Sequence, residues 1–339
     1  MLPSSNGLRK IGRSLLAPSD FYTSQDTVLT FWQKETRMKT VSKTRFKKQN
    51  LPLLFMLAIP CFFVVVYRYI PILGNIIAFQ NYLPAKGFLA SKWVGVENFR
   101  VLFNMPGFFK ALRNTVIIAL WKIALGVLVP VTFTLMLNEM KNEGVKKGVQ
   151  TLIYMPHFVS WVLLAGIFSK LLSSTGVVNQ IITALGGEKI IFLGDNHWFR
   201  FTLILTNVWK EFGFGTIVYL AAVAGVDVNL YEAAEIDGAG HWQQVLHITL
   251  PSIVPIVILM TCLSLGNILN AGFDQVFNMY SPIVYETGDI LDTLIYRMGL
   301  GTGKFSLSTA ANIFKSAVSF VFIVASYRIA YKCSGYKVF

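Results

Sequence analysis

Charged residues are scarce in this chain. Asp, Glu, Lys and Arg make up 14% of its 339 residues, whereas hydrophobic residues make up 54%. A typical soluble domain is roughly 25% charged, and a chain this poor in charge cannot cover its own surface with polar groups. The composition therefore excludes a soluble globular protein and indicates an integral membrane protein.

Acidic residues are fewer than basic ones. The 17 Asp and Glu are outnumbered by 30 Lys and Arg, which gives a formal net charge of +13. In a soluble protein this excess would suggest a nucleic-acid partner, but ten of the basic residues precede residue 50, among them Lys43, Arg45, Lys47 and Lys48. We expect residues 1–50 to form a basic cytoplasmic N-terminal tail beside the membrane, and we expect no nucleic-acid partner.

Cysteine is also rare, and the N-terminal region lacks the pattern of a cleaved leader. Cys61, Cys262 and Cys333 lie within or beside apolar segments without metal-ligand spacing, so neither a disulfide framework nor a metal site is predicted. The first fifty residues lack a short apolar core followed by a small-residue cleavage site, so we expect the tail to be retained.

Six apolar segments approach the ~20 residues that a helix needs to cross ~30 Å of hydrocarbon. The backbone must satisfy its own hydrogen bonds in lipid, so these segments should be helical. No repeat of fixed period is evident. Residues 51–339 are therefore predicted to form one all-α integral membrane domain with six transmembrane helices, near residues 51–69, 114–137, 152–172, 201–224, 248–269 and 311–331.

Six crossings would leave both termini on the same side of the membrane. The basic tail, the loop with Lys141, Lys146 and Lys147, and the basic C-terminal residues place that side in the cytoplasm. Three long loops, near residues 70–113, 173–200 and 271–308, would then be external. The loop 225–247 lacks Lys and Arg and carries four acids, so the charge rule is not obeyed everywhere.

The loop between the fourth and fifth predicted helices carries the most specific pattern in the chain. From residue 232 to residue 251 it has Glu-Ala-Ala, three residues, Gly, nine residues, Ile, one residue, Leu-Pro. The pattern resembles the cytoplasmic EAA loop of the permease subunits of bacterial binding-protein-dependent ABC importers. The matching residues are Glu232, Ala233, Ala234, Gly238, Ile248, Leu250 and Pro251. The resemblance implies the type I ABC importer permease fold, with a coupling loop at residues 226–251.

A short helix is predicted inside this loop. Asn229 is a suitable N-cap, and Glu232 could reach back to it in a variant of the capping box. The helix would end near Asp237, where Gly238 and Gly240 permit a sharp turn. In the family such a helix docks on a separate ATPase subunit, which implies coupling roles for Glu232, Ala233, Ala234, Glu235, Asp237 and Gly238. The alternative is an ordinary helical connection whose alanines serve helix propensity.

Softer motifs elsewhere indicate a branch of this family. They are Tyr-Ile-Pro at 69–71, Ile-Ile-Ala-Phe-Gln-Asn-Tyr at 76–82, Asn-Thr at 114–115, residues 209–215, Tyr-Leu-Ala-Ala at 219–222 and Pro-Ile-Val-Tyr-Glu-Thr at 282–287. Together they are similar to carbohydrate-uptake permeases that import oligosaccharides and polysaccharide fragments, a group that includes the alginate importer. The resemblance covers residues 50–339.

The family resemblance also implies an assembly and a location. The partners would be a second similar permease in a heterodimer, two ATP-binding subunits that use ATP and Mg, an extracytoplasmic solute-binding protein and the lipid bilayer. The location would be the bacterial cytoplasmic (inner) membrane, with several crossings and with both termini in the cytoplasm.

Polar residues inside the apolar segments are candidates for the substrate path. Asn207, Lys210 and Glu211 share one face of the fourth predicted helix, and Lys210 lies ~14 Å along it. An unpaired charge at that depth is costly, so this face should meet a cavity or a countercharge. The alternative is an ion pair that locks this subunit to its partner. Trp209 or Phe214 could lie against a sugar ring.

The fifth predicted helix adds Ser264, Asn267 and Asn270, which could line the same cavity or make interhelical hydrogen bonds. The predicted substrate-path residues are thus Asn207, Trp209, Lys210, Glu211, Ser264, Asn267 and Asn270. His157 and Trp161 share a face of the third predicted helix, and we expect His157 to be a hydrogen-bonded helix contact rather than a ligand.

The first two external loops carry more basic than acidic residues. They contain Lys86, Lys92, Arg100, Lys110, Arg113 and Lys189 against Glu97, Glu188 and Asp195. This charge would attract an anionic substrate, or it would meet lipid headgroups or the binding protein. We expect an oligosaccharide or polysaccharide substrate, with an acidic, alginate-like one preferred.

No motif supports catalysis by the chain itself. Gly299 to Lys304 resembles a Walker A loop, but Met298 and Phe305 stand where Gly and Ser or Thr are required. No catalytic residue, cofactor or metal is predicted, so energy must come from other subunits. The alternative is a secondary carrier driven by an ion gradient, although such carriers usually show internal repeats. A structural scaffold would leave the EAA loop without a purpose.

Overall fold

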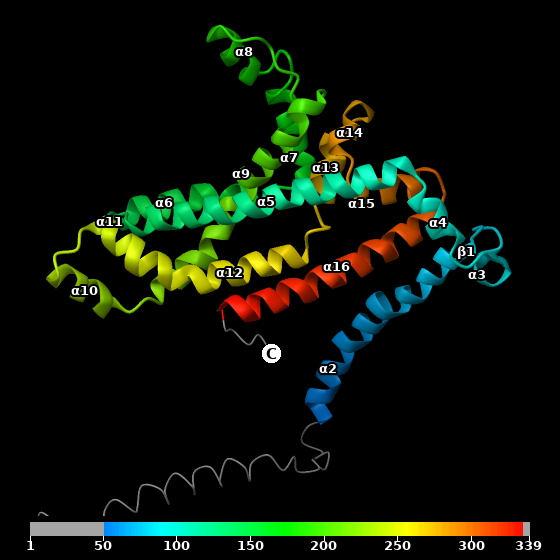
Figure 1. Cartoon of the computed structure of the whole chain (residues 1–339), viewed down its shortest axis with the longest axis horizontal. Coiled ribbons are helices and arrows are strands. Elements are labelled where there is room, and N and C mark those ends of the chain that lie inside the picture. The colour runs from blue at the N-terminus through cyan, green and yellow to red at the C-terminus, as the bar shows by residue number, and fades with distance from the viewer. Residues whose placement is uncertain (1–50, 335–339) are drawn as a thin grey trace, which may run out of the picture. The chain divides into compact units, whose positions relative to one another are not determined.

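The structure is a computed structural model that describes residues 51–334, and most of these residues are helical (Figure 1). The predicted tail, residues 1–50, lies outside the described residues. The chain divides into two compact units, Met1–Ile72 and Leu73–Phe339. The second unit contains the hydrophobic core and the candidate sites.

The first unit contains helix α2 (Leu51–Val64), the π-helical turn η2 (Val65–Tyr69) and the start of the 3-10 helix η3 (Ile70–Phe79). The apolar helical run extends from Leu53 to Phe79, ten residues beyond the predicted end at residue 69. Pro71 does not end the run, because the chain changes there from π to 3-10 geometry. Most of its apolar side chains from Leu53 to Leu73 are exposed, whereas Ala78 near its end is buried.

Three further stretches are long and apolar enough to cross a membrane. They are α5 (Pro106–Asn138), the stretch His241–Gly266, and Phe305–Ile329 within α16 (Phe305–Ser334). The stretch from His241 comprises α11 (His241–Gln244), the π-helical turn η5 (Val245–Thr249) and α12 (Leu250–Gly266). Two bent helix pairs also qualify, so the described chain has four candidate spans, or up to six if each pair is one span.

The third predicted helix is bent, and its prediction as one continuous helix was wrong. Helix α6 (Glu143–Tyr154) passes into the 3-10 turn η4 (Met155–Phe158), and α7 (Trp161–Leu171) follows at 101°. Pro156 fits the start of the 3-10 turn. The Ser160 hydroxyl caps α7 by accepting a hydrogen bond from the Leu163 amide at 3.4 Å.

The fourth and fifth predicted helices have shifted ends. Helix α9 (Asn196–Ala224) begins five residues before the predicted residue 201, because Asp195 caps it by accepting from the His197 amide. Helix α12 ends at Gly266 rather than near residue 269, and Asn267 is its C-cap. Of the predicted polar residues Ser264, Asn267 and Asn270, only Ser264 therefore lies within α12, and Asn270 lies in the following segment.

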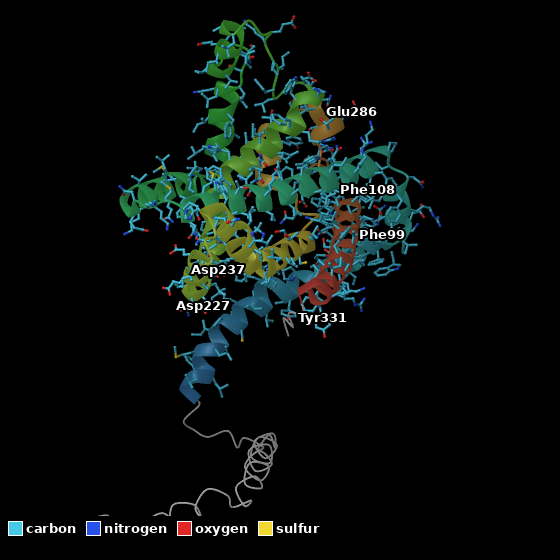
Figure 2. The ribbon with its side chains drawn as sticks, turned by 60° about the vertical axis from the view of Figure 1, so that its left-hand side comes forward. Phe99, Phe108, Asp227, Asp237, Glu286 and Tyr331 are labelled. Carbon is cyan, nitrogen blue, oxygen red and sulfur yellow. The ribbon has the colours of Figure 1, made fainter. Side chains whose placement is uncertain are left out.

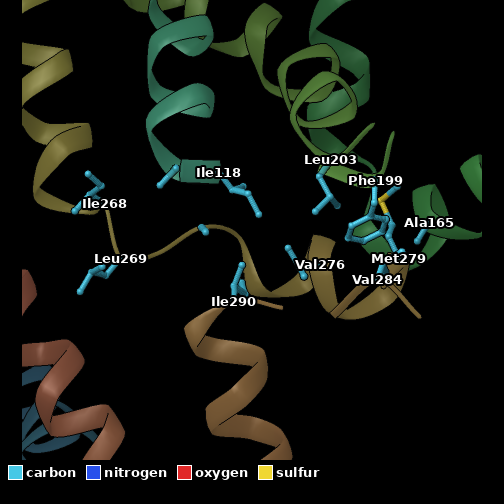
Figure 3. Packing of buried hydrophobic residues seen from close by; sticks show 12 residues of the cluster. Ile118, Ala165, Phe199, Leu203, Ile268, Leu269, Val276, Met279, Val284 and Ile290 are labelled. Carbon is cyan, nitrogen blue, oxygen red and sulfur yellow. The ribbon is translucent and has the colours of Figure 1, made fainter. Parts of the chain in front are cut away.

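The core of the second unit lies where α5 crosses α9, and α12 packs along α16 (Figure 1). Figure 3 shows buried side chains from α5, α7, α9, α13 (Phe273–Met279) and the segments between the later helices. They include Ile118, Phe199, Leu203, Leu269, Val276 and Ile290. A second cluster joins Leu102, Phe108, Leu291 and Leu307.

The remaining elements are short. They are β1 (Gln80–Asn81), α3 (Gly87–Ala90), β2 (Lys92–Trp93), α4 (Glu97–Phe103), α8 (Val177–Ala184), α10 (Val228–Ile236), η6 (Pro282–Val284), α14 (Tyr285–Gly288), α15 (Leu291–Tyr296) and η7 (Arg297–Gly301). Strands β1 and β2 are antiparallel, with Gln80 opposite Trp93 and Asn81 opposite Lys92.

Loops predicted to lie on one side of the membrane contact one another. The Asn196 side-chain amide donates to the Ile283 carbonyl at 3.1 Å, and the Tyr82 main-chain amide donates to the Ser306 hydroxyl at 2.9 Å. These contacts join all three loops that were predicted to be external. At the other end of α5, Glu139 is paired with His241 of α11.

Candidate functional site

The loop between α9 and α12 contains a short exposed helix, α10, whose ends lie near the labelled Asp227 and Asp237 in Figure 2. The Asp227 carboxylate accepts hydrogen bonds from the Asn229 main-chain amide at 3.0 Å and from its side chain at 2.8 Å. Asp227 is therefore the N-cap, and the predicted cap at Asn229 with Glu232 was wrong. A carboxylate there also interacts favourably with the positive helix end.

The sharp turn after α10 is formed by Gly238. Its φ of +76° lies in the left-handed region, which glycine adopts without steric cost. The Gly238 and Ala239 amides donate to the Glu235 and Ala234 carbonyls at 3.0 and 2.8 Å, which closes the helix end. Gly240 has an ordinary φ of −71° and instead begins α11.

The predicted coupling residues lie on the surface. Glu232, Ala233, Glu235, Asp237 and Gly238 are exposed, and Ala234 is half-buried. Beside them are two large apolar side chains that the sequence interpretation passed over, Ile236 at 87% exposure and Trp242 at 77%. Exposed apolar groups among acids are typical of a docking surface.

Side-chain contacts attach the inner side of this loop to neighbouring helices of the same chain. The Tyr231 hydroxyl is hydrogen-bonded to the Thr249 hydroxyl at 2.9 Å, and the His241 ring is paired with the Glu139 carboxylate. A recess of about 300 Å³ lies between these contacts, lined by Asn138, Lys141, Gln244 and Val245 among others. The loop therefore presents one face outward while the other is fastened to α5 and η5.

A cavity of about 390 Å³, called the central cavity below, lies between α5, α9 and the end of α12. Its lining residues are Ala119, Lys122, Ile123, Gly126, Asn207, Leu263, Ser264, Asn267, Asn270, Ala271 and Gly272. Four of the seven predicted substrate-path residues are among them: Asn207, Ser264, Asn267 and Asn270. Asn267 and Asn270 are exposed, so their amide groups are accessible to a ligand.

The other three predicted substrate-path residues, Trp209, Lys210 and Glu211, do not line this cavity. Lys210 is 5% exposed, and its Nζ donates to the His157 carbonyl at 2.7 Å and to Glu211 Oε1 at 3.0 Å. Glu211 Oε2 lies 2.7 Å from His157 Nδ1. The Trp209 ring packs edge-on against Phe168, with ring centroids 5.6 Å apart. His157 is thus a hydrogen-bonded helix contact, as expected.

This polar cluster lies at the bend between η4 and α7. The Phe214 ring stacks on the His157 ring with centroids 4.0 Å apart, and Lys210 lies 5.6 Å from the Trp161 ring centroid. Lys210 therefore satisfies a carbonyl at the bend, where helical hydrogen bonding is interrupted. The charges are paired within this chain.

Sequence reasoning missed Lys122, the charged residue of the central cavity. Its Nζ donates to the Ala271 carbonyl at 2.7 Å and to Gln275 Oε1 at 2.5 Å. The signal was present, because Lys122 is a lone cation within the apolar run 114–137. An unpaired charge inside an apolar segment is costly, and this holds for Lys122 as it does for Lys210.

Hydrogen bonds join two of the softer sequence motifs, at residues 114–115 and 282–287. Asn114 Nδ2 donates to the carbonyls of Glu286 and Asp289 at 3.0 and 3.2 Å, and its Oδ1 accepts from Arg200 at 3.0 Å. The Thr115 hydroxyl accepts from the Leu291 amide at 2.8 Å. These motifs therefore have a structural basis.

Beside this junction, Arg297 pairs with Asp289 through two hydrogen bonds of 3.1 and 2.6 Å and lies over the Tyr285 ring. Burial lowers the pKa of Arg297, but the hydrogen bonds and charge of Asp289 outweigh it, so the pKa is raised overall. Burial and a hydrogen bond to Tyr285 raise the pKa of Tyr280 to about 12. Both groups stay protonated near neutral pH.

The residues that the structure describes contain no group of three or more His, Cys, Asp or Glu that could hold a metal ion. The Walker-like segment from Gly299 lies between α15 and α16, where residues 297–301 form the π-helical turn η7. This geometry differs from the strand, loop and helix arrangement of a phosphate-binding loop.

A protein-family model described as "Binding-protein-dependent transport system inner membrane component" matches residues 126–330. The chain is 41% identical to the polygalacturonan/rhamnogalacturonan transport system permease protein YteP of Bacillus subtilis (strain 168), over 89% of this chain and 93% of that protein. It is 42% identical to protein LplB of the same organism, over 82% of this chain and 88% of that protein.

Two solved structures share the fold. A chain of a bacterial ABC transporter involved in the import of the acidic polysaccharide alginate superposes with a TM-score of 0.79 and 37% identity, over 85% of this chain and 97% of that chain. A chain of the bacterial alginate ABC transporter in complex with an alginate pentasaccharide-bound periplasmic protein also has a TM-score of 0.79, with 36% identity over 86% of this chain and 98% of that chain.

Proposed function

From the fact that the chain belongs to the family of binding-protein-dependent transport system inner membrane components, we infer that it is the membrane-spanning subunit of an ATP-driven importer of oligosaccharides or polysaccharide fragments. The observation that carries this proposal is the exposed helix α10 with its glycine turn, on a loop fastened to the ends of two long apolar helices. The family membership favours this function over a carrier driven by an ion gradient.

The proposed assembly contains a second similar permease, two ATP-binding subunits and an extracytoplasmic solute-binding protein. The similar alginate transporter forms a complex with a periplasmic protein, which supports the last of these partners. ATP and Mg would be used by the ATP-binding subunits, and the chain itself would bind no cofactor and catalyse no reaction. Its location would be the bacterial inner membrane.

Energy would pass through α10. Its outer face offers Glu232 and Glu235 to basic residues of an ATPase groove, and Ile236 can be buried there. The hydrogen bond between Tyr231 and Thr249 and the contact between the His241 ring and the Glu139 carboxylate tie the same loop to η5 and α5. A displacement of α10 would thus move the long helices as a rigid body.

We propose six crossings, with both termini in the cytoplasm. Helix α9 has 29 residues and a length of about 43 Å, so it can cross alone without α10. The chain leaves one end of α5 at Asn138 and returns to the other end at Asn196, so the bent pair α6 and α7 would also cross. Cysteine labelling from outside the cell tests this: Lys189→Cys should react, whereas Asn229→Cys should react only after permeabilisation.

An acidic substrate is the preferred cargo. Five exposed basic residues, Lys86, Lys92, Lys110, Arg113 and Lys189, lie on the segments predicted to be external, whereas Arg100 is paired with Glu97 at 3.1 Å. This charge would attract a polyanion at long range. The related alginate transporter is involved in the import of an acidic polysaccharide, which agrees with this preference.

The coupling proposal is tested by sugar-stimulated ATPase activity of the complete complex in liposomes. Gly238→Asp should abolish stimulation, because a side chain is strained at φ +76° and its carboxylate lies on the docking face. Gly240→Asp is the matched control, since φ is −71° there and Asp is a good N-cap for α11. The ATPase subunits must co-purify with both variants.

Unchanged stimulation in Gly238→Asp would contradict the coupling role of this turn. Equal loss in both variants would show that added charge, rather than turn geometry, is responsible. Transport that continues without ATP and stops when the ion gradient is dissipated would instead support the alternative function, a secondary carrier driven by an ion gradient.

A further inference from the structure

We propose that Lys122 is the residue of the central cavity that binds the carboxylate of an acidic sugar and so makes the membrane subunit itself selective for anionic substrates. The proposal rests on the proposed function and deepens it. It places selectivity inside the membrane, in addition to any selectivity of the solute-binding protein.

The charge of Lys122 is not balanced locally. Among the described residues that line the central cavity, Lys122 is the only charged one. Its two hydrogen-bond acceptors, the Ala271 carbonyl and the Gln275 amide oxygen, are neutral. No ion pair joins it to a carboxylate in the described part of the chain, so a bound anion would be its first carboxylate partner.

The acid that interacts electrostatically with Lys122 is Glu211, and it is already engaged. Its two carboxylate oxygens contact Lys210 at 3.0 Å and His157 at 2.7 Å. Neither oxygen contacts Lys122, whose side chain lines the cavity.

The position of the Lys122 ammonium is set by a chain of hydrogen bonds that has one consistent direction. The Thr206 hydroxyl donates to the Thr202 carbonyl at 2.7 Å, so its lone pair is available to accept from Gln275 Nε2 at 2.9 Å. Gln275 Nε2 also donates to the Leu203 carbonyl at 2.7 Å. Both amide protons are thereby used, and the amide oxygen must face Lys122.

The side chain of Gln275 is fully buried, so this arrangement cannot relax by exchange with water. It fixes Nζ at the rim of the cavity with two of its three protons committed. Gly272 leaves the neighbouring space open, since a Cβ at that position would lie 3.1 Å from Nζ. The third proton is available for a ligand oxygen.

The rest of the lining suits a sugar. Asn207, Ser264, Asn267 and Asn270 supply amide and hydroxyl groups that can pair with sugar hydroxyls. The volume of about 390 Å³ lies within the range of roughly 300–1,000 Å³ usual for ligand pockets. A cation among neutral polar groups distinguishes a uronate from a neutral sugar, because a carboxylate forms a charge-assisted hydrogen bond.

The test compares two forms of one sugar in the complete reconstituted complex. Uptake into ATP-loaded proteoliposomes is measured for an oligogalacturonate and for its fully methyl-esterified form of the same length. Lys122→Met should lower uptake of the acid at least about tenfold and leave uptake of the ester within about twofold, while Lys122→Arg should keep the preference for the acid.

A second variant covers the case in which Lys122→Met does not assemble. Asn267→Asp places a carboxylate on an exposed position of the same cavity, where it can pair with Lys122. It should also lower uptake of the acid selectively.

The outcomes separate the two proposals. If the wild-type complex imports the acid and either variant leaves that uptake unchanged, or lowers uptake of both forms equally, the assignment of Lys122 is wrong. If the wild-type complex imports only the ester, or neither form in an ATP-dependent way, the proposed acidic substrate fails, and the assignment fails with it.

Discussion

Gly213 of α9 lies so close to Ile153 of α6 that a Cβ on Gly213 would be 1.9 Å from the Ile153 carbonyl oxygen. This is a contact between two main chains, so no side chain can rotate out of the way. The two helices can approach only because residue 213 has no side chain.

Gly213→Ala is therefore expected to push α6 and α9 apart and to destabilise the subunit by about 1–3 kcal/mol. Thermal unfolding in detergent, followed by the reactivity of the buried Cys262 thiol, measures the effect. Gly148→Ala in α6 is the control, because a Cβ there meets no atom within 4 Å and alanine favours the helix. Equal melting temperatures for the two variants would contradict the close contact.

The cluster at the bend of the third predicted helix should behave as one unit. Lys210→Met removes the donor to the His157 carbonyl and should cost about 1–3 kcal/mol, whereas Glu211→Gln should cost less because its side chain is 40% exposed. The double variant should lose less than the sum of the two, since each single change leaves a group unpaired. Additive losses in a chemical unfolding series would show that the residues act independently.

The Tyr231–Thr249 hydrogen bond should contribute to coupling more than to folding. Tyr231→Phe and Thr249→Val each remove it, and a double-mutant cycle should give an interaction of about 0.5–1.5 kcal/mol. In proteoliposomes the number of sugars transported per ATP should fall, because α10 is less firmly tied to η5. Ser252→Ala serves as the control, since the Ser252 hydroxyl bonds to the Ile248 carbonyl, within the continuous stretch His241–Gly266, and not to α10.

Asn114 is fully buried and joins three groups from distant parts of the chain. Asn114→Ala would leave two carbonyls and one guanidinium group without this partner, so a loss of about 2–3 kcal/mol is expected. Thr132→Ala in the same helix, α5, is the matched control, because its exposed hydroxyl bonds only to the Leu128 carbonyl. A smaller loss for Asn114→Ala than for Thr132→Ala in thermal unfolding would exclude the proposed junction.

The general architecture could be predicted because hydropathy acts over local stretches. The apolar runs identify the long helices, and the turn at Gly238 follows from the Glu-Ala-Ala pattern and glycine's freedom at positive φ. The bend at residues 159–160 was missed although Pro156 and Ser160 were visible, since an unbroken apolar run conceals a change of direction.

The charged contacts could not be predicted, because their partners are distant in sequence. Lys122 bonds to residues 149 and 153 positions away, and no periodicity links them. Lys210 and Glu211 pair with each other although they project about 100° apart on the helix, since both side chains are long and meet at His157. Three-dimensional packing decides such pairs.

The bend at Ser160 also constrains how the protein is made. Helices α6 and α7 have 12 and 11 residues and rise about 18 Å and 17 Å, each short of the ~30 Å hydrocarbon layer. The donor that satisfies the His157 carbonyl at the bend, Lys210, leaves the ribosome 53 residues later. This segment therefore completes its polar contacts only after α9 has been synthesised.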